Sequence, residues 1–183
     1  MNAKKWNSKK WLAVAVVASL STFAIWLRAS TATILGVGNL SYSAAVNGPA
    51  DVTFRQFTSG PGEVGPWHFH AGAVHNIVTA GAITIEDGCG GEKTYTAGQG
   101  WEQLDGRVHR WKNNGTVWES EYNTFIVPEG SPITDTLSEQ HCGPPTVVTE
   151  CQKGGWTSFD FPHQFADQAA CVDYVKKHNG SYY

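Results

Sequence analysis

The chain has 183 residues, of which 41% are hydrophobic, 12% aromatic and 16% charged. These values suit one globular domain of ordinary size and exclude a disordered chain. The formal net charge is −3 and no basic stripe is present, so the sequence has no electrostatic footprint for nucleic acid. Only one stretch is apolar enough to enter a membrane, which excludes a protein with several spans.

Residues 1–32 form a leader with five basic residues and no acidic one. Its basic start is followed by an apolar run over residues 11–27, which is the pattern of a secretory signal and lies at the short limit for a spanning helix. Small residues at 30–32 offer a cleavage point, although Arg28 is unusual in such a region. We therefore expect an exported protein, either secreted after cleavage or anchored by residues 11–27, with membrane contact only through this segment.

Four cysteines, Cys89, Cys142, Cys151 and Cys171, agree with export because disulfides form in oxidising compartments. Four cysteines allow three pairings. Cys151–Cys171 is the favoured pair because it closes a local loop, which leaves Cys89 for Cys142. No CxxC motif is present, which argues against a thiolate zinc site.

Residues 33–50 are rich in Gly, Ser, Ala and Asn, and predict a linker or irregular arm. From residue 51 onward, short apolar or alternating segments are separated by glycine and asparagine turns, which is typical of an antiparallel sandwich or barrel. The predicted strands are 52–57, 67–70, 74–85, 93–95, 101–104, 108–112 and 117–127. The expected fold is all-β, an antiparallel double-stranded β-barrel over residues 51–135.

Residues 136–183 predict a short tail with one helix, because apolar residues recur at helical spacing over about 164–177. A unit of this size is too small for a core of its own, and we expect Cys151–Cys171 to staple it. Packing against the barrel as a cap is the favoured role, with a separate binding module as the alternative.

Four of the seven histidines fall in the barrel region: His68, His70, His75 and His109. His68 and His70 are two residues apart, and in a strand that spacing puts both side chains on one face. A bound transition metal needs such convergent imidazoles, and neutral imidazole suits Zn, Fe, Cu and Ni better than Mg or Ca.

Two stretches of the sequence resemble the two motifs of the cupin family. The stretch 65–81 has the HxH pattern at His68 and His70, followed by a strand that ends in glycine. The stretch 98–113 keeps the spacing of the second motif around His109, with Leu104 in place of the usual proline. The resemblance covers about residues 50–130. It implies a jelly-roll barrel, a metal held inside by His68, His70 and His109, and a homodimer paired through sheet edges.

The position of the family's glutamate ligand is taken by His75. His75 is interpreted as a fourth ligand, as a barrel-lining histidine bonded to a neighbour, or as a sign that the barrel has lost its metal. Glu102 is the nearest alternative carboxylate, and its preferred interpretation is a solvated strand residue. An all-histidine site would keep the full metal charge but would lack a built-in base.

The period-two alternation of strands also predicts which other side chains reach the interior. If His109 points inward, Trp111 and Asn113 do so too. Along residues 117–127 the alternation places Glu119 and Glu121 on one face and several aromatic residues on the other. The two charges make the glutamate face the predicted solvent side.

The predicted function is that of an exported cupin-type protein that binds a divalent transition metal (Fe, Cu, Zn or Ni) through His68, His70, His75 and His109. Its partner would be a small molecule. If the protein is an enzyme, oxygenase chemistry is favoured because such sites suit iron or copper with O₂, while isomerase and lyase chemistry stay open. The alternative is a non-enzymatic barrel that binds a small molecule or has a structural role without metal.

Overall fold

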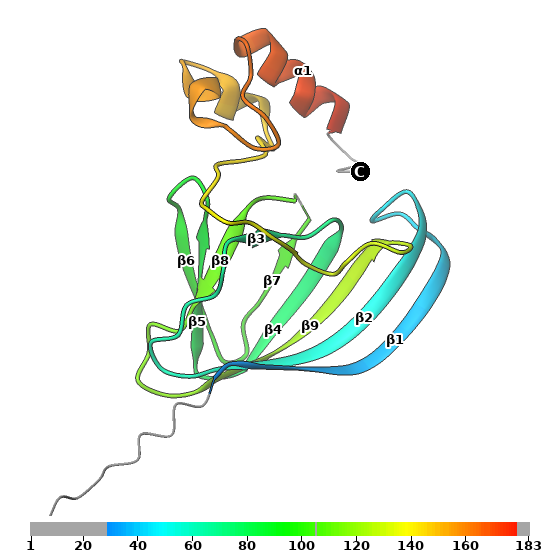
Figure 1. Ribbon diagram of the computed structural model, residues 1–183, viewed down its shortest axis with the longest axis vertical. Helices are drawn as coiled ribbons and strands as arrows, with labels where there is room; N and C mark the ends of the chain where they lie inside the picture. The colour runs from blue at the N-terminus through cyan, green and yellow to red at the C-terminus, as the bar shows by residue number, and fades with distance from the viewer. Residues whose placement is uncertain (1–28, 105, 179–183) are drawn as a thin grey trace, which may run out of the picture.

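The computed structural model describes residues 29–104 and 106–178, which fold into two antiparallel five-stranded sheets (Figure 1). The expected all-β fold with a C-terminal helix is thereby confirmed. The signal or anchor prediction falls largely on residues 1–28, outside the described residues. In spatial order, the first sheet contains β1 (Thr31–Ser43), β2 (Gly48–Ser59), β9 (Glu119–Pro128), β4 (Ala73–Ala80) and β7 (Gly100–Gln103). The second contains β10 (Asp135–Thr136), β3 (His68–Phe69), β8 (His109–Lys112), β5 (Ala82–Asp87) and β6 (Glu92–Thr96).

Strand β1 corrects the prediction of a linker at residues 33–50. It pairs with β2 from Thr31 opposite Thr58 to Ser43 opposite Gly48. The strand lies at the edge of its sheet, and its apolar side chains stay in solvent, with Val37 71% exposed. Because none of these side chains is buried, the segment shows no alternation of apolar and polar residues, which is why the sequence pattern hid it.

Strand β9 lies inside the first sheet, between β2 and β4. Every second side chain from Glu119 to Val127 is buried. The prediction that Glu119 and Glu121 face solvent is therefore wrong, since their exposed fractions are 0% and 5%. Phe125 and Val127 set the inward side of the strand, because these two apolar side chains pack with Val74 in the core.

A second apolar cluster closes the barrel around its polar interior. It consists of Phe57, Val78 and Ile83, packed against partly buried aromatic residues that include Trp101 and Trp111. The Trp111 indole lies against the backbone of Gly65, where an added Cβ would come within 2.2 Å of the indole nitrogen. Glycine is therefore required at this position for the indole to stay in place.

Contrary to the expectation that a unit of this size is too small for one, the tail carries an apolar core of its own. It is built from η1 (Val148–Cys151), η2 (Gly155–Ser158) and α1 (Gln168–His178). Its buried residues are Cys151, Phe159, Phe165, Cys171 and Val175. Helix α1 begins later than the predicted residue 164, because the Asp167 carboxylate accepts a hydrogen bond from the backbone N–H of Ala170 at 2.8 Å and caps the helix there. No helix of the described ranges is long and apolar enough to cross a membrane.

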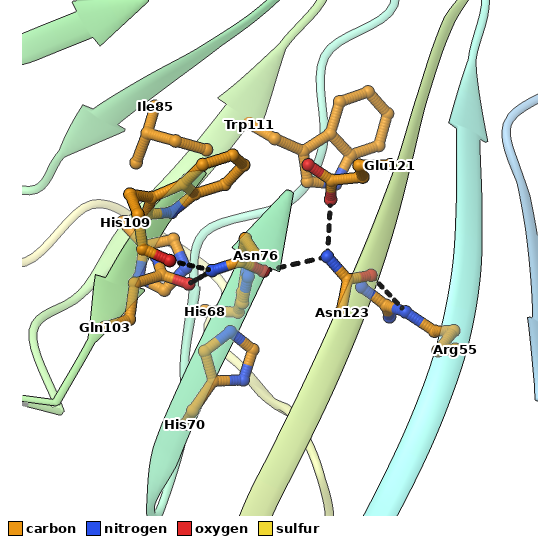
Figure 2. Close-up of a pocket in the computed structure, with 11 residues that line it drawn as sticks. Arg55, His68, His70, Asn76, Ile85, Gln103, His109, Trp111, Glu121 and Asn123 are labelled. Atoms are coloured by element: carbon orange, nitrogen blue, oxygen red, sulfur yellow. Dashed lines mark hydrogen bonds between the residues drawn. The ribbon is translucent and has the colours of Figure 1, made fainter. Parts of the chain in front are cut away.

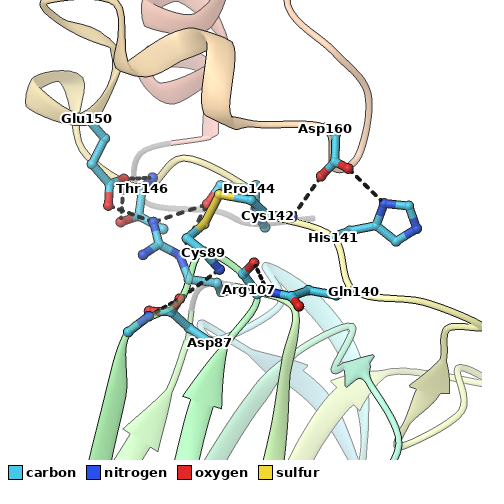
Figure 3. Close-up of a disulfide and its surroundings, with 12 residues drawn as sticks. Asp87, Cys89, Arg107, Gln140, His141, Cys142, Pro144, Thr146, Glu150 and Asp160 are labelled. Carbon is cyan, nitrogen blue, oxygen red and sulfur yellow. Dashed lines mark hydrogen bonds and ion pairs between the residues drawn. A yellow bond between two sulfur atoms is a disulfide. The ribbon is translucent and has the colours of Figure 1, made fainter.

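Both predicted disulfides, Cys89–Cys142 and Cys151–Cys171, are present. Cys89–Cys142 ties the β5–β6 turn to the start of the tail, which lies beyond the ends of β5, β6 and β8 (Figures 1 and 3). The backbones meet closely here, since a Cβ on Gly88 would lie 1.7 Å from the carbonyl oxygen of His141. Two disulfides in a domain of this size are typical of an oxidising, extracytoplasmic environment.

Candidate metal centre

The three histidines of the two motifs meet inside the barrel. His68 lies in β3, and His70 follows two residues later on the same face. Strand β3 pairs with β8 so that His68 lies directly opposite His109. The ring centroids are 4.3 Å apart for His68 and His109, 5.0 Å for His68 and His70, and 5.1 Å for His70 and His109. One ring nitrogen from each residue lies within 4.8 Å of the other two.

Backbone carbonyls fix the tautomer of all three rings. The Nδ1 of His68 donates to the Pro66 carbonyl at 2.9 Å, that of His70 to Ile133 at 2.6 Å, and that of His109 to Arg107 at 2.8 Å. A carbonyl oxygen only accepts hydrogen bonds, so each Nδ1 carries the proton and each Nε2 carries the lone pair. This arrangement, with one ring nitrogen on a carbonyl and the other facing a shared point, is typical of metal-ligating histidines.

The interior keeps these imidazoles neutral. All three are buried, and desolvation by burial is the largest cause that lowers the pKa of each ring. The pKa of His70 falls to about 3, with the charge of His68 as a second cause. Both neighbouring rings add to the depression of the His109 pKa. Neutral imidazole is the form that binds a metal, so the cluster is in its ligating form at neutral pH.

His75, the predicted fourth ligand, does not join the cluster. It lies on the outer face of β4 with its side chain 45% exposed, and its Nδ1 is 3.3 Å from a carboxylate oxygen of Glu102 on β7. The reason is alternation: Val74 and Asn76 point inward, so the residue between them points out. Glu102 is the solvated strand residue that the sequence predicted, with its side chain 60% exposed.

The polar residues that face the histidines were not predicted from the sequence. Asn76 of β4, Arg55 of β2, and Glu121 and Asn123 of β9 line the same interior cavity as the three histidines (Figure 2). The available signal was the alternation of β9, where the two glutamates share a face with Phe125 and Val127. The prediction gave more weight to the charges than to that apolar pair.

Asn123 connects these groups. Its side-chain oxygen accepts a hydrogen bond from Arg55 Nε at 2.9 Å, and its Nδ2 donates to Glu121 Oε1 and to Asn76 Oδ1, both at 2.8 Å (Figure 2). Glu121 Oε2 and Glu119 Oε1 are buried without a hydrogen-bond partner among the described residues.

Burial shifts the pKa values of both carboxyls upward. It raises the pKa of Glu121 to about 7, against the opposing effects of the Asn123 hydrogen bond and the Arg55 charge. It raises the pKa of Glu119 to about 8, helped by the charge of Glu121 and opposed by a hydrogen bond from Ser59.

The cavity beside the histidines is small. Its volume is about 30 Å³, which is room for roughly two or three water molecules. A wider pocket of about 210 Å³ shares Ile85, Trp101, Gln103 and His109 with it and adds Asp87, Tyr95 and Arg107. His109 is therefore reached from this outer pocket. As predicted, Trp111 points inward with His109 and lines the inner cavity.

The solved structures similar to this chain include cupin and double-stranded β-helix proteins. A conserved Klebsiella pneumoniae protein with a double-stranded beta-helix domain has a TM-score of 0.47 at 15% identity, covering 61% of this chain and 86% of its own. A cupin-like protein from Thermotoga maritima has a TM-score of 0.44 at 19% identity, with coverages of 59% and 75%. A cupin domain from Bordetella pertussis has a TM-score of 0.41 at 16% identity, with coverages of 54% and 93%.

No protein-family model matches the sequence, and no curated protein matches it. The similarities to solved structures have TM-scores below 0.5 and carry no argument about activity. Function is therefore inferred from the chain's own residues.

Proposed function

We propose that the protein binds a divalent transition metal (Fe, Cu, Zn or Ni) through Nε2 of His68, His70 and His109, and uses it for chemistry on a small molecule. The observation that carries this proposal is the shared tautomer: three buried neutral imidazoles each have Nδ1 on a backbone carbonyl and a lone pair on Nε2. Such a donor set fits these four metals, because imidazole is a preferred ligand of each.

Three protein ligands leave a coordination position for water or substrate, as in catalytic rather than structural sites. A metal bound there would supply Lewis-acid polarisation or, for iron and copper, redox chemistry. The surrounding residues would orient the small molecule. Glu121 presents a carboxylate oxygen that no described residue hydrogen-bonds, and Trp101, Trp111 and Ile85 form apolar walls of the cavity.

Oxygenase-like chemistry is the reaction class we propose, because open three-histidine sites suit iron or copper and the inner cavity admits a molecule the size of O₂. Isomerase and lyase activities use the same donor set and are the competing classes. A barrel without metal that only binds a small molecule is the non-enzymatic alternative.

The same proposal places the protein outside the cytoplasm, secreted or anchored by residues 11–27. Its support is the basic and apolar leader together with two disulfides. We also propose a homodimer paired through β1. This edge strand has no charged residue and no proline, the features that usually protect an exposed edge from pairing.

Zinc titration of the purified protein by calorimetry tests the metal site. Wild type should bind one equivalent, and His109→Ala should lose at least about 100-fold in affinity while keeping its β-sheet circular dichroism. His75→Ala is the matched control, because it removes an imidazole from the outer face. Wild-type protein that binds no stoichiometric zinc, iron, copper or nickel would favour the non-enzymatic alternative.

A further inference from the structure

The guanidinium of Arg55 is held inside the barrel by only one end. Its Nε donates to Asn123 Oδ1 at 2.9 Å, and its central carbon lies 4.7 Å from the ring centroid of Phe125 and 5.3 Å from that of Phe57. Within residues 29–104 and 106–178, its two terminal amino groups have no hydrogen-bond or ion-pair partner. The guanidinium plane, whose geometry suits a carboxylate, is therefore held in one orientation with its terminal amino groups available to a ligand.

Glu121 does not neutralise this cation by contact. The two side chains interact electrostatically, but no ion pair joins them, because Asn123 lies between and hydrogen-bonds to both. The second amide contact, from Asn123 Nδ2 to Asn76 Oδ1, fixes which end of the Asn123 side chain faces each neighbour. Among the described residues, the cavity wall thus holds a partly buried guanidinium with free terminal amino groups and a buried acceptor without a partner, Glu121 Oε2, separated by one amide side chain.

Both groups line the cavity that the three histidines line (Figure 2). A buried acceptor without a partner is costly, and a ligand that donates to it while pairing with the Arg55 fork removes that cost. The ligand must carry a negative charge for Arg55 and a hydrogen-bond donor for Glu121. Because the Asn123 amide bonds to both groups, the donor must lie next to the charge. The inner cavity of about 30 Å³ has room only for these polar groups, so the rest of the ligand must extend into the adjoining pocket of about 210 Å³.

We propose that the inner cavity binds the polar end of a small α-hydroxycarboxylate, with its carboxylate on the terminal amino groups of Arg55, its hydroxyl donating to Glu121 Oε2 and its remaining atoms in the outer pocket. Any reaction on this ligand rests on the proposed metal function. Binding itself needs only Arg55, Glu121 and the amide of Asn123. The outer pocket beside Trp101 and Gln103 is the route by which the ligand enters.

Calorimetric titration of purified protein with lactate, propionate and the neutral lactamide tests the assignment. Wild type should bind lactate about 10-fold or more tightly than propionate, which lacks the hydroxyl, and than lactamide, which lacks the charge. Glu121→Gln should abolish the preference for lactate over propionate. A role of Glu121 in folding alone would not change that ratio.

Arg55→Met should weaken lactate binding about 10- to 100-fold. Arg110→Met is the matched control, because Arg110 pairs with Glu86 instead of lining the cavity. If Arg55→Met fails to fold, Arg55→Lys keeps the charge, loses the planar fork and should weaken binding less. Equal binding of lactate and propionate by wild type, or lactate binding unchanged in Arg55→Met or Arg55→Lys, would overturn the inference.

Running each titration with and without zinc separates the two proposals. Arg55-dependent lactate binding in a protein that takes up no metal would leave the anion site in place and refute the metal function. Zinc binding without selective lactate binding would do the reverse.

Discussion

The barrel interior and the tail interior are built on opposite principles. The barrel encloses three histidines, two glutamates and an arginine, and two of its buried carboxylate oxygens have no hydrogen-bond partner among the described residues. As far as residue 178, the tail encloses only apolar side chains and a disulfide. Buried polar groups without partners cost stability, so the barrel has a polar interior at the expense of folding free energy. The contrast indicates that the barrel carries the chemistry and the tail is a structural unit.

The largest expected effect concerns the tail. Replacing Cys151 and Cys171 with serine removes a cross-link between residues 20 apart, which is worth about 3 kcal/mol in the chain-entropy model. A core of only five buried residues contributes little free energy of unfolding. Without the disulfide, α1 should therefore lose hydrogen-exchange protection while β9 keeps it. Equal loss of protection in α1 and β9 would show that the two interiors unfold as one.

A second prediction concerns the cost of the polar interior. The folded protein keeps the Glu119 proton up to a pKa of about 8, whereas the unfolded chain releases it near 4.5. The unfolding free energy should therefore fall as pH rises between these values. Glu119→Gln should reduce this slope and raise the unfolding free energy at pH 8 by about 2 kcal/mol.

Urea unfolding of zinc-free protein at pH 5 and pH 8 measures this effect. Glu102→Gln is the control, since that carboxylate lies in solvent. If wild type and Glu119→Gln show the same change in stability between the two pH values, burial of Glu119 has no such cost.

The smallest effect sharpens the boundary between the barrel interior and its outer surface. His75→Ala removes an exposed imidazole and its contact with Glu102, so the unfolding free energy should change by less than about 0.5 kcal/mol. Urea unfolding at pH 7 measures the change. A loss above about 1 kcal/mol would mean that the outer face of β4 contributes more than its exposure indicates.

The sequence predicted the fold class, both disulfides and the convergence of His68, His70 and His109. These features follow from local patterns: period-two spacing, turn residues and the arithmetic of four cysteines. The outward orientation of His75 was not predicted, because the spacing of the family motif was given more weight at this position than the alternation of side chains along the strand. With Val74 and Asn76 buried on either side, the alternation was the better guide.

The polar interior was harder to predict because it depends on register between strands distant in sequence. Arg55 lies opposite Asn123, and Asn76 lies opposite Asn123 on the other side, through pairings that join residues 68 and 47 positions apart. A charged residue on a strand usually faces water, and only the neighbours across the sheet show that Arg55 and Glu121 do not. Strand β1 was missed for a related reason, since an edge strand with exposed side chains has no buried face to reveal it.

Arg107 joins the barrel and the tail at the histidine cluster. Its carbonyl accepts the hydrogen bond from His109 Nδ1, and its side chain donates to the Pro144 carbonyl and pairs with Glu150 at 2.7 Å (Figure 3). The next residue, Val108, donates its backbone N–H to the carbonyl of Gly143 at 2.8 Å. The tail therefore supports the backbone that orients His109. A chain that ends at Thr136 would still contain the three histidines, but the backbone that orients His109 would lose its anchors in the tail.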